Sequence, residues 1–545
     1  MKDTMPTPIP GTNQSAMLKF GGSVLCPHRI LALACLAAAG PSTVSSAPPP
    51  NIVMIFADDL GWSDVGFNGS RFYETPHLDR LAASGMRFSD AYVAAPNCAP
   101  SRASLLTGRY PPGTGCYTVG RPDNMPGVAE GMAKLTLPEN QGSLALDQVI
   151  MAQPLREAGY KTAYFGKWHV GDSGDYVATK RGFSHGFILP KAHLQDDFGP
   201  FTTIPSVPNS IGAYQGDFLT EAALDFVAAN HSDPFFVFLS FYNMVHATNK
   251  GTHTSPDSAL TGKYFGKPPS GDDKDPVYAA KVEHLDSLVG RILARLDELG
   301  LSSNTLVIFY SDNGGAGNYT ALGSPGTRTF TDNRPLRGGK STLYEGGIRV
   351  PLVMRWPGRI PAGSLCTVPV TGVDFFPTFL DLAGISLQES LPLDGVSLLP
   401  LMEGRPPPTG SSHESGGRML WSAYVDRRPE RRNDASEVGL DAGGNLLAGT
   451  RPIFWHFPVY YGDRLQNSAW VNTPNSAIRL GRFKLIEFFE DGHLELYDLK
   501  RDLSESENLA ERHPAITAQL HTLLKQWQQE SGAFIPQPVA SQGAH

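Results

Sequence analysis

Asn51–Ala57 has the sequence NIVMIFA, a continuous apolar run that Pro50 precedes and Asp58-Asp59 follows. A strand that is buried on both faces of a sheet, as in parallel sheets, has this uninterrupted pattern because neither face meets water. Three further runs of this kind occur at residues 161–165, 235–241 (FFVFLSF) and 305–310 (TLVIFY). The sequence therefore predicts a parallel sheet that is covered on both faces.

The segments between these runs have helical periodicity. Within residues 277–299 the apolar side chains recur three or four positions apart, at Val282, Leu285, Val289, Ile292 and Leu296. This spacing places them along one stripe of a helix. Strands that alternate with helices predict an α/β fold in which helices sandwich the sheet.

The overall composition is that of an ordinary globular protein. The chain has 545 residues, of which 41% are hydrophobic and 18% charged, so it is too long for a single small core. Its net charge of -8 at pH 7 is mild and predicts no nucleic-acid partner, because such proteins carry a basic stripe. This net charge is compatible with an anionic substrate, since a few cations in a cleft outweigh a weakly negative surface.

Changes in composition divide the chain into four parts. Residues 1–47 form a leader, and residues 48–404 carry the strands and helices of a predicted catalytic domain. Residues 405–450 are rich in Pro, Gly, Ser and charge, which predicts a linker or loop region. Within residues 451–545, short segments such as SAIRL and RFKLIEFF are separated by Gly-Arg and Asp-Gly turns, and a helix is predicted at 514–530. This last part is predicted to be an antiparallel-sheet subdomain with a terminal helix.

The leader has the order of a secretory signal peptide. Positive charge up to Arg29 is followed by the apolar run ILALACLAAAG at residues 30–40 and then by small residues. We therefore expect export, to the periplasm or outside the cell. The run is too short for a stable membrane span, and Cys35 leaves a lipoprotein as the alternative. Beyond the leader, the sequence leaves open whether Cys116 and Cys366 pair.

Polar side chains follow two of the predicted strands. Asp58 and Asp59 follow the first strand, and Asp312 and Asn313 follow the run at 305–310. In an open α/β sheet, ligands bind beyond the carboxyl ends of the strands. Three carboxylates and an amide oxygen suit a hard cation such as Ca²⁺ or Mg²⁺. Either pair taken alone also fits an ordinary turn.

Cys98 lies immediately before a predicted helix, in the segment Cys98-Ala-Pro-Ser-Arg102, which ASLLTGR follows. A helix N-terminus and a neighbouring arginine both favour an anion, which points to a reactive thiol. A buried, inert cysteine is the alternative.

These motifs resemble those of the formylglycine-dependent (type I) sulfatase family, arylsulfatase-like members of the alkaline phosphatase superfamily. Cys-x-Pro-Ser-Arg before Leu-Thr-Gly-Arg is similar to the family segment in which the cysteine is oxidised to formylglycine, whose hydrated aldehyde is the nucleophile. Further similar blocks occur in the family's order at residues 51–61 (NIVMIFADDLG), 159–171 (GYKTAYFGKWHVG), 311–315 and 337–351 (RGGKSTLYEGGIRVP). The resemblance implies a large mixed, mostly parallel sheet between helices, alkaline-phosphatase-like, with a smaller C-terminal α+β subdomain.

The resemblance also implies a metal centre and a nucleophile. Arg102 would hold the gem-diol of the modified Cys98, and His169 would take the proton of its second hydroxyl. The implied Ca²⁺ ligands are Asp58, Asp59, Asp312, Asn313 and an oxygen of the modified Cys98.

The remaining implied roles concern the sulfate group and the leaving group. Lys167 and Lys340 would hold sulfate oxygens, because an anionic ester must be shielded before a nucleophile can approach. His246 would protonate the leaving oxygen. The residues around His246, Met-Val-His-Ala-Thr, differ from the family's commoner Pro-His.

The implied activity is that of a sulfatase, which releases sulfate from an organic sulfate ester on a small molecule or, more in keeping with the sequence, a saccharide. A formylglycine-generating maturation enzyme is the implied partner, and the oligomeric state is left open. The alternatives are a phosphate or phosphonate ester hydrolase of the same superfamily and a sugar-binding relative without catalysis. A binding relative would be expected to lack a ligand or a cation, and none is missing here.

Two segments are candidates for the rim of the substrate pocket, residues 196–217 and residues 455–463 (WHFPVYYGD). The aromatic side chains of the second segment suit stacking on sugar rings. Packing of these side chains between the two domains is the alternative.

Overall fold

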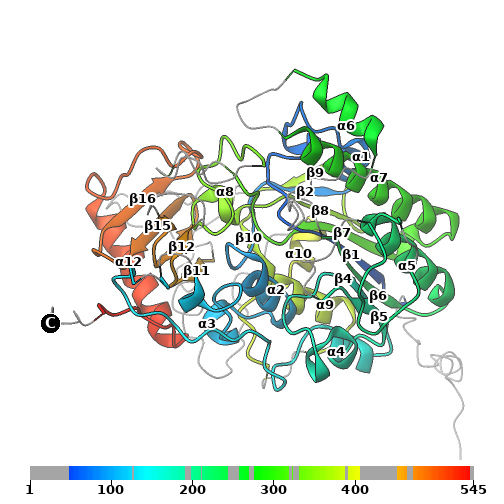
Figure 1. Ribbon diagram of the computed structural model, residues 1–545, viewed down its shortest axis with the longest axis horizontal. Coiled ribbons are helices and arrows are strands. Elements are labelled where there is room, and N and C mark those ends of the chain that lie inside the picture. Colours follow the sequence, from blue (N-terminus) through cyan, green and yellow to red (C-terminus); the bar gives the residue numbers. More distant parts are fainter. Residues whose placement is uncertain are drawn as a thin grey trace, which may run out of the picture. The chain divides into compact units, whose positions relative to one another are not determined.

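The computed structural model describes most of residues 48–539 (Figure 1). Residues outside the description are 1–47, 126–127, 130, 191–197, 210–211, 243–256, 269–274, 318–321, 323–329, 387–390, 405–450, 463–469 and 540–545. Pro48–His545 forms one compact unit. The leader and the linker region therefore lie outside the described residues, and the domain boundaries at 404 and 450 stay predictions.

The main sheet has eight strands and confirms the predicted mixed, mostly parallel architecture. Its spatial order is β5 (His185–Ile188), β4 (Lys161–Gly166), β6 (Phe235–Ser240), β1 (Asn51–Ala57), β7 (Thr305–Ser311), β8 (Leu352–Arg355), β2 (Met86–Phe88) and β9 (Ser364–Cys366). The five strands from β5 to β7 are all parallel, whereas β8 is antiparallel to both of its neighbours. The three apolar runs predicted as strands are β4, β6 and β7, so β1 lies in the middle of the sheet.

Both faces of β1 are buried, which explains its uninterrupted apolar sequence. Val53 and Ile55 pack into the core that includes helices α1 (Pro76–Ala83), α5 (Gln215–Asn230) and α7 (Pro276–Glu298). Met54 and Phe56 face the opposite core, which includes α2 (Cys98–Thr107), α4 (Ala152–Glu157) and α9 (Phe375–Leu382). Figure 1 shows α5 and α7 running side by side.

Helix α7 confirms the predicted apolar stripe, because all five of its members are buried. The helix begins where Asp275 accepts hydrogen bonds from the backbone amides of Val277 and Tyr278, 2.8 and 3.2 Å away. Pro276 occupies the first helical position, where its missing N–H group leaves no bond unmade.

The C-terminal part forms a separate antiparallel sheet, as predicted. Its order is β11 (Ile453–Phe457), β14 (Asn475–Leu480), β15 (Phe483–Phe488) and β16 (Leu494–Asp498). Helix α12 (Pro514–Glu530) packs against β14 and β15 (Figure 1). The ring of Trp527 stacks on that of Phe454 with a centroid separation of 4.7 Å, so an aromatic contact joins helix and sheet.

The remaining elements are short. Two pairs of strands stand apart from the larger sheets: β3 (Ala91–Tyr92) with β10 (Val370–Thr371), and β12 (Tyr461–Gly462) with β13 (Trp470–Asn472). The other helices are α3 (Pro111–Thr114), α6 (Ser258–Phe265), α8 (Glu345–Ile348) and α10 (Leu399–Met402). Single turns of 3-10 helix lie at Gly66–Asn68, Pro122–Asn124, Gly174–Tyr176, Ala178–Lys180, Ser302–Asn304 and Gly372–Asp374.

Two predictions from the sequence concern membranes and disulfides. Among the residues that the structure describes, no helix has the length and apolar character needed to cross a bilayer. Cys116 and Cys366 are both buried and free, so the pair that the sequence left open is not formed.

Candidate active site

The predicted metal-binding pairs meet at the carboxyl ends of two adjacent parallel strands. Ala57 at the end of β1 is in register with Ser311 at the end of β7. The backbone N–H of Asp59 donates to Oδ1 of Asp312 over 3.0 Å, and Asp59 has a left-handed φ of 57°. Asn313 Nδ2 donates to Oδ1 of Asp59 over 2.7 Å. Parallel pairing therefore brings together two pairs of side chains that are separated by more than 250 residues in sequence.

Cys98 joins this group as the first residue of α2. Its Sγ lies 3.7 Å from Oδ1 of Asp59. One potential ligand atom from each of Asp58, Asp59, Cys98 and Asp312 lies within 4.8 Å of all the others, and all four residues are buried. Burial raises the pKa of the Cys98 thiol to about 12, although Lys167 and Lys340 act in the opposite direction. The thiolate expected from the helix N-terminus alone is thus disfavoured, because burial outweighs that effect.

Arg102 lies one helical turn after Cys98 and points to the same group. Its Nε and Nη2 both donate to Oδ2 of Asp312, over 2.9 and 2.7 Å, so two charge-assisted hydrogen bonds join the ion pair at one oxygen. Its Nη1 donates to Oγ of Ser240 and to the carbonyl oxygen of Lys167, over 2.7 and 2.9 Å. Arg102 is buried, so it fixes the positions of Asp312 and of the segment that carries Lys167.

Lys167 and Lys340 approach the carboxylates from two different segments. Lys167 directly follows β4, and its Nζ hydrogen-bonds to Oδ1 of Asp58 and lies 3.8 Å from Oδ2 of Asp312. Lys340 Nζ lies 2.7 and 2.5 Å from the two carboxylate oxygens of Asp59. Both predicted sulfate-binding lysines therefore lie at the carboxylate group.

Gly166, the last residue of β4, allows the backbone to turn so that Lys167 reaches the site. Gly166 has a φ of 112°, and a Cβ built there would lie 1.9 Å from the carbonyl oxygen of Ser240. Only a residue without a side chain fits at this point of the backbone. The chain can thus turn at the end of β4, and Lys167 follows next to β6.

His169 is the last of the predicted catalytic residues that the structure describes. It has a left-handed φ of 64°, and its Nδ1 is buried without a hydrogen-bond partner among the described residues. Burial, followed by the charges of Lys167 and Arg102, holds the pKa of His169 well below its usual value. The imidazole is therefore neutral at pH 7. His246 lies outside the described residues.

The donor atoms fit a hard divalent cation. Burial raises the pKa of Asp58 to about 7. Burial by itself would also raise the pKa of Asp312, but Arg102 and Lys167 outweigh it and hold that pKa well below the ordinary value. Asp58 Oδ2 and Asn313 Oδ1 are buried without a hydrogen-bond partner in the described chain. Buried oxygens of this kind are costly unless they bind a donor or a cation.

Two residues of the site were not predicted from the sequence. Ser240 accepts a hydrogen bond from Arg102, and the ring of Tyr242 lies under Lys167, with Nζ 5.0 Å from the ring centroid. Ser240 is the last residue of β6 and belongs to the run FFVFLSF, whereas Tyr242 directly follows that run. The rule that ligands bind at the carboxyl ends of strands would have found them if it had been applied to this strand as well.

The described residues of the two segments that were proposed for the pocket rim make different contacts. In the described part of the first segment, Phe201 stacks on Phe218 of α5 at 5.4 Å, which holds the segment against that helix. In the second, Trp455 is buried and donates to the carbonyl oxygen of Val93 over 2.7 Å, so interior packing is confirmed for this residue. Tyr461 is only partly buried and lies close enough to Lys340 for that charge to affect its pKa.

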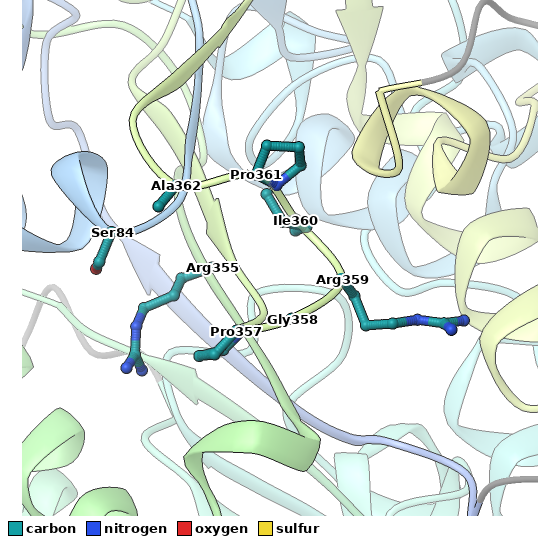
Figure 2. Close-up of a pocket in the computed structure, with 8 residues that line it drawn as sticks. All are labelled: Ser84, Arg355, Pro357, Gly358, Arg359, Ile360, Pro361 and Ala362. Atoms are coloured by element: carbon teal, nitrogen blue, oxygen red, sulfur yellow. The ribbon is translucent and has the colours of Figure 1, made fainter.

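A separate surface pocket of about 500 Å³ shares no residue with this group. Its lining includes Arg355 and Arg359, whose side chains point away from each other (Figure 2). Arg355 lies 4.0 Å from Asp297, and Arg359 lies 3.4 Å from Glu403. Because the two cations diverge and face carboxylates, the pocket does not form an anion site.

Fold and site together define a class: an alkaline-phosphatase-like α/β hydrolase, with carboxylates and cations gathered at the carboxyl ends of the strands. The profile of the sulfatase family matches residues 50–385. The chain therefore belongs to the sulfatase family, and it is an enzyme of the sulfatase type.

Relatives agree with this family over most of the chain. N-acetylgalactosamine-6-sulfatase of Mus musculus is 35% identical over 393 residues, 68% of this chain and 69% of the relative. A sulfatase of Formosa agariphila is 30% identical and covers 94% of both chains. Among solved structures, Ps i-CgsB has a TM-score of 0.66 and 27% identity, over 89% of this chain and 93% of its own. That protein has also been solved in complex with k-i-k-neocarrahexaose.

Proposed function

We propose that this sulfatase uses a formylglycine made from Cys98, together with Ca²⁺, to hydrolyse sulfate esters on a carbohydrate. The observation that carries the proposal is the position of Cys98 at the start of α2, against Asp58, Asp59 and Asp312. Lys167 and Lys340 contact the same carboxylates. The proposed nucleophile, the proposed metal ligands and two lysines that could bind an anionic group therefore lie together in one buried site.

The residues that would hold the metal are Asp58, Asp59, Asp312 and Asn313, with an oxygen of the modified Cys98. Bound there, Ca²⁺ would favour the ionised form of the nucleophilic hydroxyl. Arg102 keeps Asp312 in place through two hydrogen bonds to its Oδ2. It would also face the hydroxyl groups of the modified residue from the next turn of α2.

The lysines and histidines would act on the substrate and on the proton. Lys167 and Lys340, held beside the aspartates, would contact the sulfate oxygens and offset their negative charge. Neutral His169, whose Nδ1 has no hydrogen-bond partner among the described residues, would accept the proton whose removal regenerates the enzyme. His246, beyond β6, is proposed to protonate the leaving oxygen.

Calcium should stabilise the folded protein. Because the ion binds the native state only, a calcium concentration 100 times the Kd should raise the free energy of unfolding by about 2.7 kcal/mol. The measurement is a thermal melt with and without a chelator. Asp59→Asn should lose the response, whereas Asp286→Asn should keep it, since buried Asp286 binds backbone amides of α1. A response that survives Asp59→Asn would contradict this metal site.

A carbohydrate substrate is proposed on two grounds. The relatives include a sulfatase named for a sugar, and a structural neighbour was solved with an oligosaccharide. In this chain, Tyr461 places an aromatic, partly buried side chain near Lys340. Aromatic rings beside a polar group suit a sugar face and its hydroxyls.

The test is sulfate release from a panel of sulfated mono- and oligosaccharides, with nitrophenyl sulfate and the matching phosphate esters beside them. We expect kcat/KM for the best saccharide to exceed that for the aryl sulfate by about 10-fold or more. Tyr461→Ala should weaken hydrolysis of the saccharide but leave the aryl ester within about 2-fold. A preference for the aryl sulfate would overturn the carbohydrate substrate, and a preference for phosphate would overturn the sulfatase assignment.

We further propose that residues 1–47 direct export and are removed. The order of charge, apolar run and small residues supports this. Mass spectrometry of protein recovered from the periplasm or medium would show a mature N-terminus near residue 47. An intact leader on cytoplasmic protein would contradict it.

A further inference from the structure

Charged side chains are buried between α8 and the C-terminal four-stranded sheet. The three cations are Lys484, Arg349 and Arg479, and the three carboxylates are Glu345, Glu505 and Asp90. The side chains of Lys484, Glu345 and Glu505 have no exposed surface. Burying charges costs free energy even when they are paired, so stability alone is a weak explanation for this cluster.

Lys484 of β15 is at the centre of the cluster. Its Nζ donates to Oε1 of Glu345 over 3.0 Å and to Oε1 of Glu505 over 2.9 Å. Glu505 in turn accepts the backbone N–H of Glu345 over 2.7 Å. Lys484 of the C-terminal sheet therefore binds the side chain of Glu345, the residue that begins α8, and Glu505, which follows the sheet in the chain, binds its backbone.

The other end of the same segment is held as well. We call residues 337–345 the lysine loop, because Lys340 lies within it. At its start, Nη1 of Arg337 donates to the hydroxyl of Tyr497 over 2.9 Å and to the carbonyl oxygen of Glu505 over 3.0 Å. Residues of the C-terminal part thus hydrogen-bond to the lysine loop on both sides of Lys340, at Arg337 and at Glu345.

Close backbone packing links these anchor points to the catalytic group. The N–H of Gly346 donates to the carbonyl oxygen of Arg337 over 2.8 Å, which closes the loop. The N–H of Ser341 donates to the carbonyl oxygen of Pro96, two residues before Cys98, over 2.7 Å. A Cβ on Gly314 would lie 1.8 Å from the carbonyl oxygen of Gly346. A displacement at Glu345 would therefore reach both Lys340 and the segment of Asn313.

We propose that Lys484, Glu505 and Tyr497 are positioning residues that fix Lys340 at the active site through the lysine loop. The C-terminal sheet then contributes to catalysis without touching the substrate. This inference rests on the proposed role of Lys340 in holding the sulfate group. The physical basis is that a cation acts on a transition state only when it is already in place, and a misplacement of about 1 Å can cost about 100-fold.

The test compares Lys484→Met and Tyr497→Phe with Glu487→Gln as the control. Glu487 belongs to the same strand, but its carboxylate faces α12, where it binds His521 and Gln528. The first readout is hydrogen exchange of the backbone amides of the lysine loop and Gly346 in the full chain. The second is kcat/KM for a sulfate ester.

We expect Lys484→Met to speed exchange in the lysine loop by about 10-fold or more and to lower kcat/KM by about 100-fold. Tyr497→Phe leaves the ion pairs of Lys484 with Glu345 and Glu505 intact. It should change both readouts in the same direction by a few-fold, and it carries the test if Lys484→Met does not fold. Glu487→Gln should leave both near the parent values.

Unchanged exchange in the variants, or an equal loss of activity in Glu487→Gln, would overturn the positioning role. If the parent protein hydrolyses no sulfate ester, the proposed function fails instead. The exchange measurement then still decides whether the C-terminal sheet holds the lysine loop.

Discussion

Cys98→Ala is expected to lower sulfate-ester hydrolysis by roughly 10⁴-fold or more, because it removes the proposed nucleophile itself. The fold should persist, since the only polar contact of the Cys98 side chain among the described residues is the weak 3.7 Å approach of Sγ to Asp59. The measurement is kcat on the best sulfate ester of the panel, alongside a thermal melt. Cys116→Ala is the matched control, because Cys116 is an equally buried cysteine that belongs to no part of the site.

The same experiment requires direct evidence of the modified residue. In parent protein made together with a formylglycine-generating enzyme, the tryptic peptide 88–102 should be roughly 18 Da lighter than its cysteine form. Cys98→Ala abolishes that change. An unmodified Cys98 in active parent protein would overturn the formylglycine mechanism, and an active Cys98→Ala variant would exclude this residue as the nucleophile.

Arg102→Met is the substitution with the second-largest expected effect. Arg102 donates two hydrogen bonds to Oδ2 of Asp312 and lies 3.4 Å from Asp58. Its loss therefore leaves buried Asp312 without its main cation, and Asp58 keeps its ion pair with Lys167. Removing one partner of a buried ion pair typically costs about 3–5 kcal/mol of stability. We also expect hydrolysis to fall by roughly 10³-fold, because Arg102 holds the segments of Asp312 and Lys167 together.

The melting temperature without calcium and kcat with excess calcium are the two measurements for this variant. Arg181→Met is the control, because Arg181 is also buried but donates to the backbone carbonyl oxygens of Leu144, Ala145 and Gln148. It should lower stability with little effect on kcat per folded molecule. Full activity of Arg102→Met at saturating calcium would show that the cation alone organises the carboxylates.

Much of the fold could be predicted from the sequence because its central strands have a simple local pattern. Burial on both faces requires an apolar side chain at nearly every position, and β1, β6 and β7 satisfy this. The stripe of α7 is equally local, with a period of 3.6 residues. Strand β8, which pairs with β7 in the antiparallel orientation, was not predicted from the sequence. The composition of a short buried strand does not indicate its direction.

The predicted active site depended on two kinds of information. The position of polar residues at strand ends identifies Asp58, Asp59, Asp312 and Asn313 on physical grounds. Lys167, His169 and Lys340 came from the resemblance to the family alone. Nothing in the spacing of Lys340 indicates that its Nζ lies 2.5 Å from a carboxylate oxygen 281 residues away.

The sequence by itself determined the strands, the main helices and the segment that carries Cys98, because these depend on side-chain periodicity and on neighbours within a few residues. Only the tertiary structure decided which side chains meet. In the folded chain Trp455 is buried, Arg102 pairs with Asp312, and Lys484 pairs with Glu345. Such contacts join residues far apart in the chain, and they follow from how whole elements pack, which no local pattern encodes.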